Sequence, residues 1–223
     1  MPAAIRFHFD LLSPYAYVAW RALPPIAARH GRAIEATPVL FAAILDHHGQ
    51  KGPAEIPAKR AYALKDAYRK AAALGVLPIA PPPSHPFSPL LALRVAGLVP
   101  LEDRGRAVDA LFDAVWAGGG GVETEETVRA VLDAANLEGA SLVESSREPS
   151  AKQILRDATS RAIAEGVFGV PTMLVDGELF FGVDSLPHLD RFLSGDDAVP
   201  EDLVARWATL PSTATRPGSK DSG

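Results

Sequence analysis

Ser13 is the side chain whose type and place best suit chemistry. It stands in FDLLSPYAYVAW, Phe9 to Trp20, where a predicted strand turns into a predicted helix that begins at Pro14. The first N–H groups of a helix are unpaired and partly positive, so a serine there caps the helix or helps to hold an anion. The chain has no cysteine, which removes disulfides and thiol chemistry of its own. The residues alone leave both interpretations of Ser13 open.

The elements that must position Ser13 form a βαβ unit. Alternating apolar and polar residues predict a strand over residues 5–10, and a helix follows over about 14–30 with Ser13 as its N-cap. Residues 33–40 predict a second strand. The length of the unit favours a parallel pairing of the two strands.

The middle of the chain has helical periodicity and no convincing strand pattern. Helices are predicted over 56–75, 90–99, 101–117 and 124–135, with a proline-rich connection after the first of them. We therefore expect a helical block inserted into another domain.

Strand signals return near the C-terminus. A helix over 150–166 precedes two short apolar runs around Asp176-Gly177, which predicts a tight hairpin, and a last helix is expected from Asp184 or Ser185 to Gly195. This order predicts an α/β, thioredoxin-like fold split by an all-helical insertion. The expected parts are the two halves of the thioredoxin-like domain at 1–40 and 150–210, the insertion at 41–149 and a disordered tail at 211–223.

Val170-Pro171, within GVFGVPT, is the second candidate for the site. A thioredoxin-like fold places a cis-proline at such a junction, facing the start of the first helix. With a cis bond, the amide and carbonyl of Val170 are expected beside Ser13, without partners in their own sheet and able to bind an extended peptide. Base rates favour a trans bond, whereas the layout favours cis.

Three blocks resemble a known family in sequence and in order: FDLLSPYAY, IPAKRAYALKDAYRK and GVFGVPTMLVDGELFFGVDSL. They are similar to glutathione-dependent 2-hydroxychromene-2-carboxylate isomerases, which group with kappa-class glutathione transferases in the wider family of the disulfide oxidoreductase DsbA. The resemblance spans about residues 5–193. It implies cis-trans isomerisation of a ring-opened aromatic acid, with glutathione as a regenerated cofactor and a homodimer as the usual assembly. DsbA enzymes need a cysteine pair where this chain has SPYA, so disulfide exchange is excluded.

The resemblance implies that Ser13 is no nucleophile and donates a hydrogen bond to the sulfur of bound glutathione. A thiol of pKa ~8.5 is mostly protonated at neutral pH. A hydrogen bond to a charged group contributes roughly 1.5 to 3 kcal/mol, equivalent to about one to two pKa units, and the helix terminus adds ~0.3 to 1 kcal/mol. Together these contributions suffice to make the thiolate the major form near pH ~7.

The resemblance carries further roles to matching positions. It implies Val170 and Pro171 at the cysteinyl part of glutathione, Asp184 at the γ-glutamyl amine and Lys59 near the glycyl carboxylate. Their ordinary alternatives are an N-cap for Asp184 and an exposed helical lysine for Lys59. Gln50 stands where relatives usually have asparagine. Val183 replaces a hydroxyl residue of the kappa transferases and has no polar group to offer, so the affinity for glutathione is left open.

An apolar pocket for the aromatic acid is also expected. His85, in a loop, is a candidate for the substrate carboxylate, although a solvated histidine is the favoured interpretation. Tyr17 and Phe41 are favoured as ordinary core residues. The candidate pocket residues are Leu11, Leu12, Tyr15, Tyr17, Phe41 and Phe87.

Composition excludes other classes of function. A net charge of −5 and an isoelectric point near 5.7 give no basic surface for nucleic acid or anionic membranes, and no apolar run is long enough to span a bilayer. We expect a cytoplasmic protein. His47 and His48 are adjacent and point about 100° apart on a helix, so no metal site is predicted. A kappa-like transferase and a non-catalytic peptide-binding module remain as alternatives.

Overall fold

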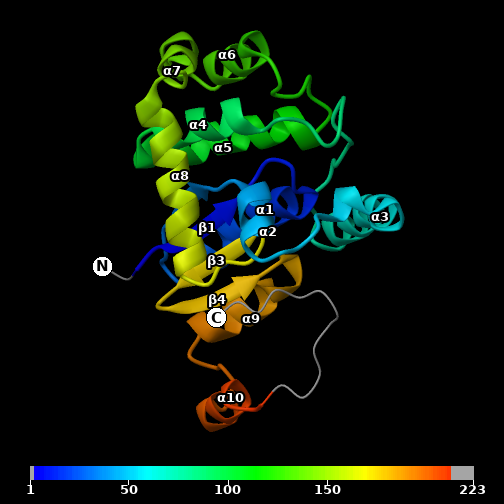
Figure 1. The fold of residues 1–223 in the computed structure, drawn as a ribbon, viewed down its shortest axis with the longest axis vertical. Helices are drawn as coiled ribbons and strands as arrows, with labels where there is room; N and C mark the ends of the chain where they lie inside the picture. Colours follow the sequence, from blue (N-terminus) through cyan, green and yellow to red (C-terminus); the bar gives the residue numbers. More distant parts are fainter. Residues whose placement is uncertain (1–2, 212–223) are drawn as a thin grey trace.

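A four-stranded mixed sheet positions the two candidate segments (Figure 1). The computed structural model describes residues 3–211. Strand β1 pairs in parallel with β2 and antiparallel with β3, which pairs antiparallel with β4. The expected strands and the parallel βαβ pairing are therefore confirmed. The strands are β1 (Ile5–Phe9), β2 (Ile34–Pro38), β3 (Thr172–Val175) and β4 (Glu178–Phe181).

Helix α1 (Pro14–Arg29) begins and ends as expected. Ser13 has an extended backbone at the N-cap and Pro14 stands at the first helical position, where its missing N–H costs nothing. After the C-cap, Gly31 takes a positive φ of 61°, which ends the helix. The N-terminus of α1 is thereby fixed at the end of β1.

Helices α3 to α7 come between β2 and α8 (Pro149–Ala164) in the sequence. The four helices predicted in this block are confirmed as α3, α4, α5 and α6. One continuous apolar core joins them to the sheet: the rings of Phe9 and Phe112 lie 5.4 Å apart, and Trp116 Nε1 donates to Leu11 O at 2.8 Å. The division of the chain at 40 and 149 remains a prediction. The block consists of α3 (Pro57–Ala73), α4 (Leu90–Leu98), α5 (Leu101–Trp116), α6 (Glu125–Ala134) and α7 (Gly139–Ser145).

Three short helical segments were not expected: α2 (Phe41–His47), a 3-10 turn (Pro53–Glu55) and α7. None has a side-chain cap on its own N-cap residue. The first amide of α2 is instead bonded by a carboxylate from the end of β1, 31 residues earlier. Local sequence signals therefore say little about where α2 begins.

The C-terminal elements follow the prediction except at the N-cap of the expected last helix and in the presence of a further helix after it. Asp176 and Gly177 both have positive φ, as the hairpin requires. Helix α9 (Leu186–Leu193) follows a 3-10 turn (Val183–Ser185), so Asp184 is not its N-cap.

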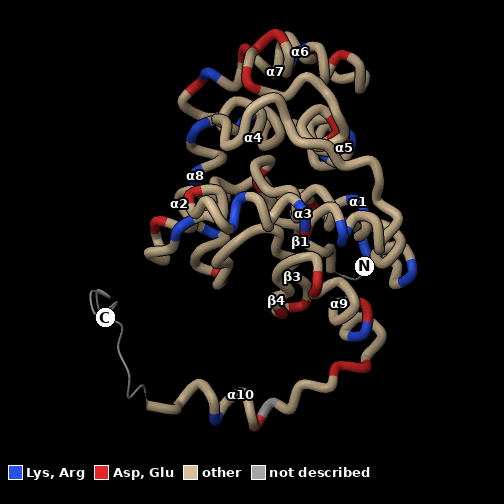
Figure 2. Tube along the Cα trace, turned by 90° about the vertical axis from the view of Figure 1, so that its right-hand side faces the viewer, with Lys and Arg blue, Asp and Glu red and all other residues tan. Residues whose placement is uncertain are grey.

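Helix α9 is not the last helix, because α10 (Glu201–Ala208) comes after it, set apart from the rest of the chain (Figures 1 and 2). Pro200 followed by acidic residues is a start signal that the sequence analysis overlooked. The predicted tail lies outside the described residues except for Pro211. Within the described part of the chain, no helix is both long and apolar enough to cross a membrane.

Candidate functional site

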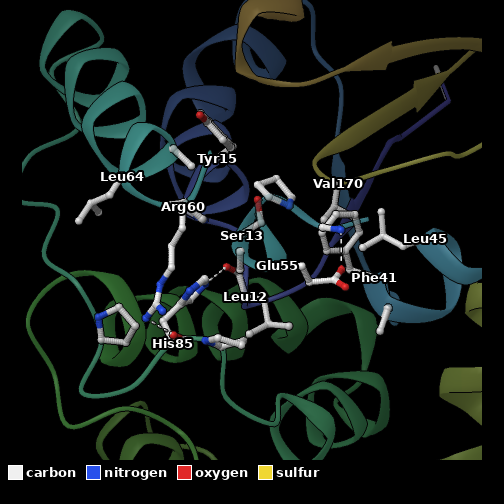
Figure 3. A pocket seen from close by; sticks show the side chains of 18 of the residues that line it. Leu12, Ser13, Tyr15, Phe41, Leu45, Glu55, Arg60, Leu64, His85 and Val170 are labelled. Carbon is white, nitrogen blue, oxygen red and sulfur yellow. Dashed lines mark hydrogen bonds between the residues drawn. The ribbon is translucent and has the colours of Figure 1, made fainter. Parts of the chain in front are cut away.

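A cleft of about 460 Å³ opens at the N-terminus of α1 (Figure 3). Its walls come from the loop before α1, from α2 and α3, from the proline-rich loop and from the β-hairpin. Ser13, Glu55, Arg60 and His85 are its polar side chains. The apolar lining residues include Leu12, Pro14, Tyr15, Phe41, Leu45, Leu64, Pro81, Pro82, Trp116 and Phe181. The cleft therefore suits a small, mostly apolar molecule with few polar groups.

Ser13 is both the cap of α1 and part of the cleft wall. Its side chain accepts a hydrogen bond from the Ala16 amide at 3.1 Å, and the residue is 7% exposed. A hydroxyl that accepts one bond still carries its own proton. The two interpretations of Ser13 are therefore compatible, because capping leaves the O–H able to donate to a ligand.

The Val170-Pro171 peptide bond is cis, as the layout predicted. Val170 lines the cleft, and Figure 3 shows it on the side of Ser13 away from Arg60. The ladder to β1 and β4 begins at Thr172, and Gly182 N donates to Pro171 O at 2.9 Å. Among residues 3–211, neither the amide nor the carbonyl of Val170 has a hydrogen-bond partner. This backbone can accept an extended peptide.

The other residues implied for glutathione do not line the cleft. Gln50 and Lys59 are exposed, Pro171 is buried and absent from the lining, and Val183 is buried in the main core. Asp184 is 81% exposed at its side chain. The structure thus brings Ser13 and Val170 together and leaves the remaining candidates outside the cleft wall.

Asp184 is engaged by a lysine that the sequence analysis missed. Lys70 Nζ lies 3.2 Å from Asp184 Oδ1 and 2.8 Å from Asp66 Oδ2, and Asp66 Oδ2 also accepts from the Tyr15 hydroxyl at 3.0 Å. The hydrogen bond from Lys70 lowers the pKa of Asp66, and Asp66 in turn raises the pKa of Lys70. This network links the cleft wall at Tyr15 to Asp184.

Of the pocket residues predicted from sequence, Leu12, Tyr15 and Phe41 line the cleft, whereas Leu11, Tyr17 and Phe87 do not. Tyr17 is a core residue, as favoured, and its hydroxyl donates to Pro78 O at 3.0 Å. Phe41 packs against a small core cluster, as favoured, but its half-buried side chain also lines the cleft.

The interpretation of His85 as a solvated histidine is also wrong. Its ring is half-buried, lies edge-on to Trp116 at 5.7 Å and has Nε2 at 3.0 Å from Leu12 O. A carbonyl only accepts, so Nε2 carries the proton that it donates. His85 therefore holds the residue next to Ser13.

Asp10 was also missed. It is fully buried; Oδ1 accepts from Leu12 N at 3.0 Å and Oδ2 from Phe41 N at 2.9 Å. Burial raises the pKa of Asp10 to about 6, and the two backbone hydrogen bonds oppose that rise. This carboxyl joins two segments of the cleft wall. Its position directly after β1 was the only signal in the sequence.

Comparisons with known proteins identify the family and the fold. The 2-hydroxychromene-2-carboxylate isomerase of Sphingobium xenophagum is 32% identical over 198 residues, which cover 86% of this chain and 99% of that protein. Glutathione S-transferase kappa 2 of Caenorhabditis elegans is 30% identical over 209 residues, covering 85% and 91%. A solved 2-hydroxychromene-2-carboxylate isomerase has the same fold, with a TM-score of 0.78 at 24% identity over 94% of this chain and 100% of that one. The DsbA-like thioredoxin domain matches residues 4–194, and the chain belongs to that family.

Proposed function

We propose that this protein is a glutathione-dependent isomerase acting on a ring-opened aromatic acid such as 2-hydroxychromene-2-carboxylate. The observation that carries the proposal is a serine hydroxyl in the wall of an apolar cleft, beside an unpaired backbone segment at Val170. The proposal is supported by similarity to an isomerase that is covered over 99% of its own length.

The residues of the cleft fit the cysteinyl part of glutathione. In this proposal the amide and carbonyl of Val170, unpaired within residues 3–211, bind the extended peptide backbone, and the Ser13 hydroxyl donates to the neighbouring sulfur. When bound, glutathione supplies the nucleophilic sulfur that a chain without cysteine lacks. Ser13 lowers the pKa of that sulfur by roughly one to two units through the hydrogen bond.

The fit at the two ends of glutathione rests on charges outside the cleft lining. Asp184 pairs with Lys70, so a γ-glutamyl ammonium would share this carboxylate with an existing cation. The adjacent ammonium of Lys70 offers a partner for a carboxylate at the same end. Val183, being buried apolar core, adds no polar contact. We therefore expect binding that depends mainly on Ser13, Val170 and the Asp184–Lys70 pair.

The apolar walls act on the aromatic substrate. Tyr15, Phe41 and Trp116 present aromatic surfaces to the cleft, and packing of an aromatic ring against them excludes water from the reacting carbons.

The test is an assay with protein that has been dialysed free of small thiols. Substrate isomerisation should occur only after glutathione is added, and the concentration of free thiol should stay constant over many turnovers. Full activity without added thiol would refute the proposal.

A kappa-class-like transferase is the second candidate, because such a relative is 30% identical to this chain. It predicts that free thiol is lost in proportion to substrate consumed. A non-catalytic peptide-binding module is favoured only by the unpaired backbone at Val170. It predicts peptide binding without turnover of either kind.

A further inference from the structure

We propose that Arg60 binds the carboxylate of the substrate, so that the cleft selects flat aromatic acids over neutral aromatic molecules of the same shape. This inference rests on the proposed function and names the substrate class of that site. It assigns a specificity-determining role to Arg60, which is not among the site residues predicted from the sequence.

The charges in the cleft point to Arg60. Glu55 and Arg60 are the charged side chains among its lining residues. Glu55 is already held by its own turn, since Oε1 accepts from Gly52 N at 2.6 Å. Arg60 has no carboxylate partner within the described residues. An unpaired guanidinium beside apolar walls is complementary to a ligand with an apolar body and one negative group.

Hydrogen bonds fix where the guanidinium lies. Arg60 Nη2 donates to His85 O at 2.6 Å, and His85 Nε2 donates to Leu12 O at 3.0 Å. Leu12 directly precedes Ser13, so this chain of bonds ties the cation to the segment that carries the hydroxyl. Figure 3 shows the Arg60 side chain extending from α3 toward His85, with Ser13 between it and Val170.

The guanidinium has capacity for a ligand. Arg60 carries five N–H donors, and one interaction, with His85 O, is found among the described residues. The planar fork matches a carboxylate through two parallel hydrogen bonds. His85, which the sequence analysis considered for the carboxylate, instead positions Arg60 through its carbonyl.

Ligand size agrees with this arrangement. A cleft of about 460 Å³ is within the usual range for small-molecule sites. A carboxylate at Arg60 would leave the attached carbon chain and aromatic ring to the apolar residues of the cleft. This order suits an acid whose conjugated bond lies between a carboxylate and a ring.

The experiment is calorimetric titration of thiol-free protein with cinnamate and with its neutral isostere, cinnamamide. Wild type should bind cinnamate about fivefold more tightly, the upper end expected for a charge-assisted pair at an exposed site. Arg60→Gln should remove that preference by weakening cinnamate alone, and Arg60→Lys should retain part of it. Arg69→Gln, on the same helix but outside the cleft, is the matched control and should bind like wild type.

A parallel titration with glutathione separates this inference from the proposed function. Arg60→Gln should leave the glutathione affinity within about twofold of wild type, because we assign Arg60 to the other ligand. Loss of glutathione binding with cinnamate unchanged would assign Arg60 to the tripeptide and overturn the inference. Equal affinity of wild type for acid and amide, or no binding of cinnamate at millimolar concentration, would also overturn it. Cinnamate selectivity without any glutathione binding would refute the proposed function and leave the inference standing.

Discussion

Replacing Asp10 by asparagine tests how the cleft is held together. The carboxyl accepts from Leu12 N and Phe41 N, and both of these residues line the cleft. Asparagine has the same shape but one acceptor oxygen, and its NH₂ group would face the second backbone N–H. A buried donor left without a partner costs about 1 to 3 kcal/mol, so at low pH, where Asp10 is protonated, we expect Asp10→Asn to lower the free energy of unfolding by about that amount.

The pH dependence of that loss provides a sharper test. Burial raises the pKa of Asp10 from 3.8 to about 6. Folding therefore favours the protonated form of Asp10 over the ionised form by roughly 3 kcal/mol. Between these two pH values the folded state binds more protons than the unfolded state. The contribution of Asp10 to stability is therefore largest below pH 3.8 and declines as pH rises through about 6.

The assay is chemical denaturation of wild type and Asp10→Asn at several pH values from ~3.5 to ~7. The stability advantage of wild type should shrink as pH rises, because the other carboxyls contribute equally to both proteins. Asp46→Asn, at an exposed position, is the control and should stay within about 0.5 kcal/mol of wild type. Parallel curves for wild type and Asp10→Asn would refute a raised pKa, and a variant as stable as wild type at pH ~3.5 would refute the bonding role.

Two further predictions concern the cleft wall and its charged neighbour. Trp116→Phe should lower the free energy of unfolding by about 1 to 3 kcal/mol in denaturant titrations, because it leaves the carbonyl of Leu11 without its buried donor; an unchanged midpoint would contradict this. Asp184→Asn should weaken glutathione binding about threefold in calorimetry, since the carboxylate is exposed and shared with Lys70, while cinnamate binding stays constant. An equal loss for both ligands would show instead that the variant disturbs the cleft.

Much of the scaffold was predictable because its signals are local. Ser13-Pro14 predicts the start of α1, and Asp176-Gly177 predicts the hairpin, since each pair has the backbone preference that its position requires. Ser13 follows β1 and Val170 precedes β3, and these two strands are neighbours in the sheet. The meeting of Ser13 and Val170 in one cleft is therefore a consequence of topology.

The features that escaped prediction depend on distant partners. Helix α2 begins where Asp10 bonds its first amide, so no pattern near Phe41 indicates that this ring faces the cleft. His85 is fixed by the carbonyl of Leu12, 73 residues away. Lys70, on α3, meets Asp184 in the 3-10 turn that follows the hairpin. Periodicity describes one element at a time and cannot show contacts of this kind.

The most direct test of the central claim is the pKa of the glutathione thiol in the bound state, followed by ultraviolet absorbance of the thiolate as pH is varied. Ser13→Thr retains the hydroxyl and serves as the matched control for Ser13→Ala. The account predicts a thiol pKa below that of free glutathione in wild type and Ser13→Thr, and a value roughly one to two units higher in Ser13→Ala. The same thiol pKa in wild type and Ser13→Ala, with glutathione bound to both, would contradict it.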